Sequence, residues 1–234
     1  MTESELTSST MKRCEESDPD ASTAGLESLR ESERIIAFTD AVVAVAITLL
    51  ILPLMEFATG EADSGREFFR RKTALMSSFV TSFVIISLCW GGHDKIFSRV
   101  RRLTPLVTLL NFGFMICVVW MPVATSLLDF RDRAPYICYA VTLFTTRLLL
   151  AIMFSIIRRD PRMWAKSSRP TAQFFSLAAE VRSYVGVALF GLAGLLSVFG
   201  PVHGTSRQAF YALIVLKAPI CWALKRLFPA LMAG

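Results

Sequence analysis

The sequence predicts an all-α integral membrane protein with six transmembrane helices per chain and no separate soluble domain. Of its 234 residues, 53% are hydrophobic and 19% are charged, whereas soluble domains carry charge on about a quarter of their residues. A transmembrane helix needs about 20 mainly apolar residues. Runs of this kind lie at 35–55, 74–93, 104–128, 135–157, 177–200 and 208–228. Because these runs take up well over half of the chain, little length remains outside the membrane.

The segment before the first apolar run has a different composition. Residues 1–32 are rich in Ser, Thr, Glu and Asp and contain almost no aliphatic stretch, so they cannot bury enough apolar surface to offset the entropy of ordering. They also lack the basic stretch and short apolar core of a secretory signal peptide. We therefore expect a disordered cytoplasmic tail over 1–32 and one six-helix membrane domain over 33–230.

The distribution of basic residues predicts a multi-pass protein of the cell membrane with both termini in the cytoplasm. Cytoplasmic loops are enriched in Lys and Arg. The loops after the second and fourth runs, with the C-terminal end, hold Lys95, Arg99, Arg101, Arg102, Arg158, Arg159, Arg162, Lys166, Arg169, Lys225 and Arg226. The loop after the first run is an exception, because it holds Arg66, Arg70, Arg71 and Lys72. The net charge of +6 therefore reflects topology, and no nucleic-acid-binding module is visible.

Polar residues gather at the expected cytoplasmic ends of the first three runs. Arg34 and Asp40 lie at the start of the first run, Trp90 and His93 at the end of the second, and Asn111 early in the third. A charge in a membrane segment is costly and by default marks a functional site. Arg34 and Asp40 lie six residues apart, nearly on opposite sides of a helix, so each needs a partner on another helix. These groups predict one hydrogen-bonded cluster. Taken singly, the tryptophan also fits an interfacial belt and the histidine a solvated helix end.

Other chemistry-bearing residues do not form a catalytic or metal-binding pattern. The five cysteines are scattered without a C-x-x-C pair, and the only histidines, His93 and His203, fall on opposite sides of the membrane. These residues predict neither a nucleophile–base pair nor a metal cluster. The sequence therefore predicts neither an enzyme nor a cofactor. Arg147 and Lys217 lie within the fourth and sixth runs. A structural pairing with a carboxylate or backbone carbonyls is favoured for them over a lipid, gating or ion-path site.

One face of the first run is a candidate pore lining. At 100° per residue, Ala41, Val45, Thr48 and Leu52 fall within about 60° of one another. The other flank carries bulkier residues suited to packing, namely Val43, Ile47, Leu50 and Leu54. Val45 and Leu52 are separated by about 10.5 Å of helix. A stripe of this kind is more often core or lipid-facing surface, so the residues alone leave both interpretations open.

Three of these regions resemble the transmembrane protein 175 family, which comprises the lysosomal-type potassium channels and their prokaryotic relatives. The family's motifs are Arg-x-x-x-Phe-Ser-Asp in the first helix, Ser-Phe and Trp-x-x-His in the second, and an Asn and Pro-x-x-Thr in the third. The matching residues are Arg34, Phe38, Thr39, Asp40, Ser82, Phe83, Trp90, His93, Phe97, Asn111, Pro122 and Thr125. The chain departs from the family at Thr39, where Ser is usual, at Ala41, where Gly is common, and at Asp94, which replaces a second His.

The resemblance implies a potassium-permeable channel of the leak type, weakly selective over sodium. In that family the first helices line the pore, and aliphatic rings with a threonine ring between them form the constriction. The corresponding residues are Val45, Thr48 and Leu52, with Ala41 on the same face, and potassium passes transiently near Thr48. Animal members carry two six-helix repeats per chain and pair as dimers, so the single repeat here implies a homotetramer in the lipid bilayer. The chain has no Thr-Val-Gly-Tyr-Gly loop, so the fold lacks a P-loop carbonyl filter.

The alternative function is a proton-coupled secondary transporter. Such proteins use broken helices near the middle of the membrane, and Pro53, Pro122 and Pro219 are candidates for helix breaks. Asp40 and His93 would then relay protons. Against this interpretation, the first run has no Gly-Pro interruption and no acidic residue lies at mid-depth.

Overall fold

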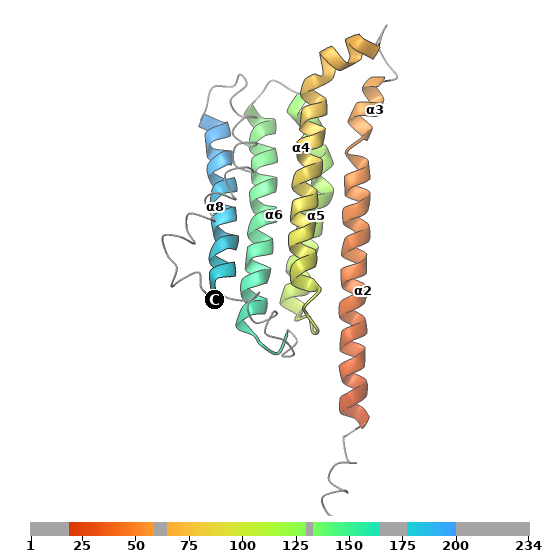
Figure 1. The fold of residues 1–234 in the computed structure, drawn as a ribbon, viewed down its shortest axis with the longest axis vertical. Helices are drawn as coiled ribbons and strands as arrows, with labels where there is room; N and C mark the ends of the chain where they lie inside the picture. Colours follow the sequence, from red (N-terminus) through yellow and green to blue (C-terminus); the bar gives the residue numbers. More distant parts are fainter. Residues whose placement is uncertain (1–18, 59–64, 130–132, 164–176, 200–234) are drawn as a thin grey trace, which may run out of the picture.

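The chain folds into a bundle of long helices that stand side by side. A computed structural model describes residues 19–58, 65–129, 133–163 and 177–199, and the regular structure in these ranges is helical. The helices are α2 (Pro19–Leu49), α3 (Leu52–Ala58), α4 (Gly65–Phe97), α5 (Pro105–Ser126), a 3-10 turn η1 (Leu127–Asp129), α6 (Arg133–Arg159) and α8 (Leu177–Phe199). Figure 1 shows α2 at one side of the bundle, α8 at the other, and α4, α5 and α6 between them.

The prediction of six transmembrane helices per chain is wrong. Four helices of the described ranges are long and apolar enough to cross a membrane, over Leu29–Met55, Met76–Phe97, Pro105–Ser126 and Arg133–Arg159. They correspond to the first four predicted runs. The fifth run forms α8, which is not among these spans and carries Glu180 in its first turn. The sixth run, 208–228, and Lys217 lie outside the described residues.

The first helix begins earlier than the composition of the chain suggested. α2 starts at Pro19, inside the segment 1–32 that sequence analysis assigned to a tail, while residues 1–18 lie outside the described ranges. Proline is well placed in the first turn of a helix, because its missing N–H would have no partner there. In Figure 1 this end of α2 projects beyond the rest of the bundle.

The first span is interrupted close to Pro53. α2 ends at Leu49 and α3 begins at Leu52. Proline lacks a backbone N–H, and its ring collides with the carbonyl group four residues earlier, which belongs to Leu49. At the break, the N–H groups of Leu50 and Ile51 donate to carbonyl groups three residues back, each at 3.3 Å. The stretch between Val45 and Leu52 is therefore not the continuous α-helix that the expected rise assumed.

The core joins α2 to the other helices through a few side chains. Val43 and Ala46 of α2, with Leu50 just after its end, are buried in one hydrophobic cluster with Ile85 of α4 and Phe114 of α5. The spacing of these three positions is that of one helix face. Within the described part of the chain, the opposite face of α2 is largely exposed.

Helices α6 and α8 approach each other closely where α8 carries glycine. A Cβ atom added at Gly194 would lie 3.1 Å from the Cβ of Ala140, and one added at Gly191 would lie 3.1 Å from the ring of Phe144. Small residues of this kind let helix backbones pack closely in membranes. In contrast, a Cβ added at Gly91 of α4 would meet nothing within 4 Å.

This contrast predicts opposite effects for two alanine substitutions. Gly91→Ala is expected to stabilise the protein by up to about 1 kcal/mol, because alanine is the better helix former and has open space there. Gly194→Ala is expected to gain nothing or to destabilise, because its methyl group must displace Ala140. Thermal unfolding of both variants in detergent checks this expectation. An equal gain in stability for both would contradict the close packing of α6 and α8.

Candidate functional site

The candidate pore face of the first span is exposed in the part of the chain that the structure describes. Val45 is 58% exposed and Leu52 is 47% exposed, and Ala41 and Thr48 are exposed as well. Val43, on the opposite flank, is only 2% exposed. An uncovered row of aliphatic side chains on a membrane helix faces lipid, another subunit or a pore. The structure thus places all of the predicted constriction residues on one free surface, with Leu52 beyond the break in the helix.

The hydroxyl of Thr48, the threonine in this row, donates its hydrogen to a backbone carbonyl of its own helix. Thr48 Oγ1 donates to the carbonyl oxygen of Val45 at 2.7 Å. A hydroxyl has one donor hydrogen and two acceptor lone pairs, so the remaining lone pairs of Thr48 are available to a cation. This local bond fixes the direction of the hydroxyl without help from another helix.

Behind the free face, a buried chain of hydrogen bonds joins three helices. Thr39 of α2, His93 of α4 and Asn111 of α5 are each at most 1% exposed. His93 Nε2 lies 2.8 Å from Asn111 Oδ1, and Asn111 Nδ2 donates to Thr39 Oγ1 at 2.7 Å. Thr39 Oγ1 in turn donates to the carbonyl oxygen of Ile35 at 2.9 Å. Since Asn111 Oδ1 can only accept, the ring of His93 donates through Nε2.

The imidazole of His93 is held between two aromatic rings. Its ring centroid lies 4.1 Å from that of Phe97 and 5.1 Å from that of Phe114, and both pairs are stacked. Among the described residues, the buried Nδ1 atom has no hydrogen-bond partner. The ring is therefore fixed by one hydrogen bond and by packing on both of its faces.

The other polar residues of the predicted cluster are placed differently. Trp90 Nε1 donates to Asp40 Oδ1 at 2.8 Å, and this pair lies at the exposed edge of α2 and α4. Arg34 and Phe38 are exposed on α2. The structure thus brings Asp40 together with Trp90, keeps the buried chain through His93 separate, and leaves Arg34 outside both groups.

A hydroxyl cluster lies further along the same helices. Ser82 Oγ of α4 is 2.8 Å from Thr125 Oγ1 of α5 and 2.9 Å from the hydroxyl of Tyr139 of α6. All three side chains are buried. Ser82 and Thr125 belong to the motifs found in the sequence, but sequence analysis missed Tyr139, since nothing in its own run distinguishes it from other aromatic residues.

A second polar network, centred on Glu180, joins α6 to α8. Glu180 forms an ion pair with Arg158 and accepts a hydrogen bond from Ser155 at 2.7 Å, and Ser155 lies 3.1 Å from the hydroxyl of Tyr184. The sequence signal was the occurrence of Glu180 four residues before Tyr184 on one apolar run. This network fixes the start of α8 against the end of α6.

The mid-span charge Arg147 packs on an aromatic ring. Its guanidinium carbon lies 5.5 Å from the ring centroid of Phe190, and its side chain is buried. A cation over the face of an aromatic ring is attracted by the ring quadrupole. Its Nε has no hydrogen-bond partner among the described residues. Among the described residues, the contact of Arg147 is thus with an aromatic ring and not with the carboxylate or carbonyl group that was expected.

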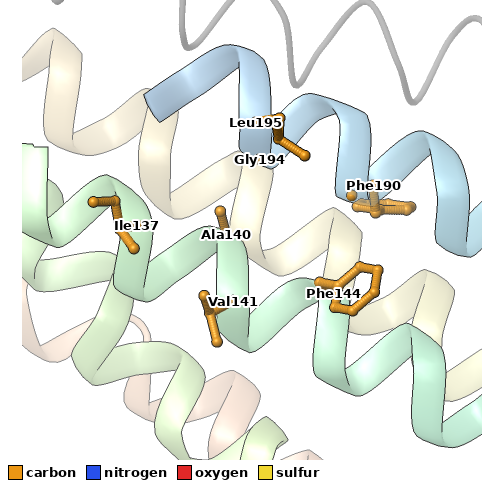
Figure 2. A pocket seen from close by; sticks show the side chains of 8 residues that line it. Ile137, Ala140, Val141, Phe144, Phe190, Gly194 and Leu195 are labelled. Atoms are coloured by element: carbon orange, nitrogen blue, oxygen red, sulfur yellow. The ribbon is translucent and has the colours of Figure 1, made fainter. Parts of the chain in front are cut away.

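An apolar pocket of about 270 Å³ lies between α6 and α8, as Figure 2 shows. Its walls are Ile137, Ala140, Val141, Phe144, Phe190, Gly191, Gly194 and Leu195. The pocket offers a cation no oxygen ligands, and it lies on the side of the bundle away from α2. Within the described ranges, His, Cys, Asp and Glu side chains form no group of three that could hold a metal ion.

Comparisons with known proteins find close relatives of this chain. The family described as the endosomal/lysosomal potassium channel TMEM175 matches residues 34–122. A potassium channel of Streptomyces collinus is 30% identical over 205 residues, which cover 77% of this chain and 98% of that protein. An endosomal/lysosomal proton channel TMEM175 of Danio rerio is 25% identical over 105 residues, which cover 44% of this chain and 20% of that protein.

The arrangement of the helices also has a match among solved structures. The crystal structure of a lysosomal potassium-selective channel TMEM175 homolog from Chamaesiphon minutus has a TM-score of 0.63 to this chain, at 23% identity. The match covers 82% of this chain and 98% of that chain. At this level of identity the likeness shows a shared fold.

Proposed function

Because the chain belongs to the TMEM175 family, we propose that it forms a potassium-permeable channel of the leak type that is weakly selective over sodium. The chain is a multi-pass membrane protein, and its bacterial relative is named a potassium channel. The observation that carries the proposal is the free face of α2. It presents Ala41, Val45 and Thr48 away from the core, and Leu52 at the start of α3 is exposed as well. No catalytic role is proposed.

The proposed pore requires several copies of α2. One chain supplies one such helix, so a central pore needs a symmetric oligomer, with the same face of α2 turned to the axis in each subunit. We propose a homotetramer in the cell membrane with both termini in the cytoplasm. A single channel domain over 33–230 follows an N-terminal cytoplasmic extension over 1–32. The exposed aliphatic residues on α2 support the oligomer, and the charges of the loops support the orientation in the membrane.

Selectivity in this proposal comes from dehydration rather than from a carbonyl filter. Rings of Val45 and Leu52 make a narrow apolar passage in which an ion must shed water, and hydrophobic constrictions of this kind gate by dewetting. Potassium gives up its hydration more readily than sodium, so the passage favours potassium. The lone pairs of Thr48 replace part of the lost hydration shell.

The proton-coupled transporter finds less support in the helices. Of the proline positions that suggested broken helices, Pro53 lies at the break after α2, but α5 continues through Pro122 to Ser126. Asp40 bonds to Trp90 and His93 bonds to Asn111, so the two groups are not arranged as a direct proton relay.

Purified protein in planar bilayers tests the proposed function. Opposing gradients of potassium and sodium salts are expected to give a reversal potential that favours potassium modestly. Passive current down the gradient, without a second solute, supports a channel. A chloride-selective current, a proton current alone, or flux strictly coupled to another solute contradicts the proposal.

The Thr48→Val variant is expected to keep its assembly and lose potassium preference. Valine has the shape of threonine but offers no lone pair to a dehydrated ion, and the lost hydroxyl bond to Val45 lies within one helix turn. The potassium-to-sodium permeability ratio of the variant, measured on protein of verified oligomeric state, is expected to fall toward 1. Thr48→Ser, which keeps the hydroxyl, serves as the control. An unchanged ratio in Thr48→Val would remove Thr48 from the permeation path.

A further inference from the structure

Two loops at one end of the bundle carry an exposed basic surface. The first loop joins α4 to α5, and the second follows α6 and is described to Met163. Figure 1 shows that these positions share the end of the bundle from which α2 projects. We call the exposed arginines on these loops and at the end of α6 the basic surface; they are Arg101, Arg102, Arg159 and Arg162. Arg101 and Arg102 follow the span that ends at Phe97, Arg159 is the last residue of the span of α6, and Arg162 follows it.

Backbone hydrogen bonds hold the two loops together. The N–H groups of Arg101 and Arg102 both donate to the carbonyl oxygen of Met163, at 2.8 and 3.4 Å. The side chain of Met163 is buried, as is that of Val100. The N–H of Met163 in turn donates to the carbonyl oxygen of Asp160 at 3.1 Å. The loops are thus anchored by their backbones and apolar side chains, while their arginine side chains point to the outside.

The charges of this surface are not neutralised within the described ranges. Glu180 forms its ion pair with Arg158, which is not part of the basic surface. Asp160 Oδ1 accepts the backbone N–H of Arg162 at 3.0 Å, so it serves as a turn-stabilising group. Within the described ranges, the guanidinium groups of the basic surface form no ion pair, and they remain available to an external anion.

The same loop also contacts the proposed pore helix. Ser32 of α2 is buried, and its hydroxyl donates to the carbonyl oxygen of Arg101 at 3.4 Å. The backbone of Arg101 therefore connects α2 on one side with Met163 on the other. An anion held by the side chains of Arg101 and Arg102 would sit on the segment that links α2 to the end of α6.

We propose that the basic surface binds the phosphate of anionic phospholipid headgroups in the adjacent leaflet. Guanidinium groups match phosphate oxygens in a two-pronged geometry that lysine does not reproduce. Residues just beyond the ends of transmembrane helices lie at headgroup depth, and basic clusters there are attracted to anionic lipid. The inference rests on the proposed membrane placement of the helices, and it does not depend on ion conduction.

Native mass spectrometry of the detergent-solubilised protein tests lipid binding directly. With equal amounts of phosphatidylglycerol and phosphatidylcholine, the wild-type protein is expected to retain phosphatidylglycerol preferentially. Each basic residue near an anionic surface contributes about fivefold in affinity. The triple variant Arg101→Gln, Arg102→Gln, Arg162→Gln is therefore expected to lose about 100-fold in affinity for phosphatidylglycerol and to bind phosphatidylcholine as before.

The control removes a similar charge from the other end of α6. Arg133 is exposed at the start of that helix, and Arg133→Gln is expected to leave the lipid preference unchanged. Inorganic phosphate at the same concentration as the lipid is expected not to displace phosphatidylglycerol. The proposal is overturned if the triple variant keeps the full preference, if Arg133→Gln loses as much, or if phosphate alone empties the surface.

A second measurement covers the case in which the triple variant does not fold. Raising the salt concentration to about 1 M shortens the screening length to about 3 Å, so the phosphatidylglycerol preference of the wild-type protein is expected to fall sharply. A preference that is insensitive to salt would contradict an electrostatic headgroup site. Because these readouts need no current, protein that binds the lipid but passes no potassium would refute the proposed function and leave this inference standing.

Discussion

Replacing Leu52 with asparagine is expected to raise the potassium current of the assembled protein about tenfold or more, since each 1.4 kcal/mol removed from a barrier is about tenfold in rate. Leu52 is on the free face of the first span and is 47% exposed within one chain. A ring of leucine side chains repels water, and a ring of asparagine amides retains it. A hydrated passage lets sodium through with part of its shell, so potassium preference is expected to fall together with the rise in current.

Leu52→Ile is the matched control for this variant. It keeps the size and the apolar character of the side chain, so neither conductance nor reversal potential is expected to change. Single-channel recording on protein of verified oligomeric state distinguishes a larger current from a larger number of channels. If Leu52→Asn assembles normally and conducts like the wild type, the residue faces lipid or a neighbouring helix rather than the pore.

Asn111→Ala is expected to cause a large loss of stability. The change strands the buried Nε2–H of His93, which now donates to Asn111 Oδ1, and it removes the donor to Thr39. An unsatisfied buried group costs about 1–3 kcal/mol, and the space left by the amide adds a cavity cost. Against a total stability of about 5–15 kcal/mol for a typical protein, this loss is expected to lower the thermal midpoint and the yield of folded assembly.

Two further variants separate this effect from a general sensitivity of the region. Trp90→Phe removes the hydrogen bond to Asp40, but Trp90 lies at the exposed edge, so it is expected to cost about 1 kcal/mol or less. The double change His93→Phe, Asn111→Leu removes both polar partners and is expected to recover part of the loss. A larger loss of stability for Trp90→Phe than for Asn111→Ala would contradict this account. It would show that the exposed hydrogen bond between Trp90 and Asp40, and not the buried hydrogen bonds through Asn111, holds these helices together.

The arrangement of the first span could be predicted from its periodicity. Apolar residues at helical spacing determine which face packs, and the buried Val43 and Leu50 and the exposed Val45 and Thr48 follow that pattern. The periodicity of a segment depends only on its own residues, so it predicts the packed face of a helix without knowledge of the rest of the fold. The four spans over the first four apolar runs could be predicted from the length and the apolar composition of those runs.

Features that depend on contacts between distant residues could not be predicted in this way. Tyr139 lies beside Ser82 only because α6 packs against α4, and Glu180 meets its partner Arg158 only because α8 packs against α6. The helical start at Pro19 was missed because composition alone was used to assign the tail. For Tyr139 and Glu180, the deciding partner lies in another part of the chain. For the start of α2, the deciding factor is local helix propensity.

Silver block of the Val45→Cys variant is the most direct test of the claim that permeating ions pass along the free face of α2. Silver ions are close to potassium in size and bind thiolates, so they reach a pore-lining cysteine by the permeation path. Potassium current through Val45→Cys is expected to be lost on exposure to silver, while the wild-type protein and Val43→Cys, whose side chain faces the core, keep their current. Full current through silver-treated Val45→Cys, or equal block of all three proteins, would contradict this location of the pore.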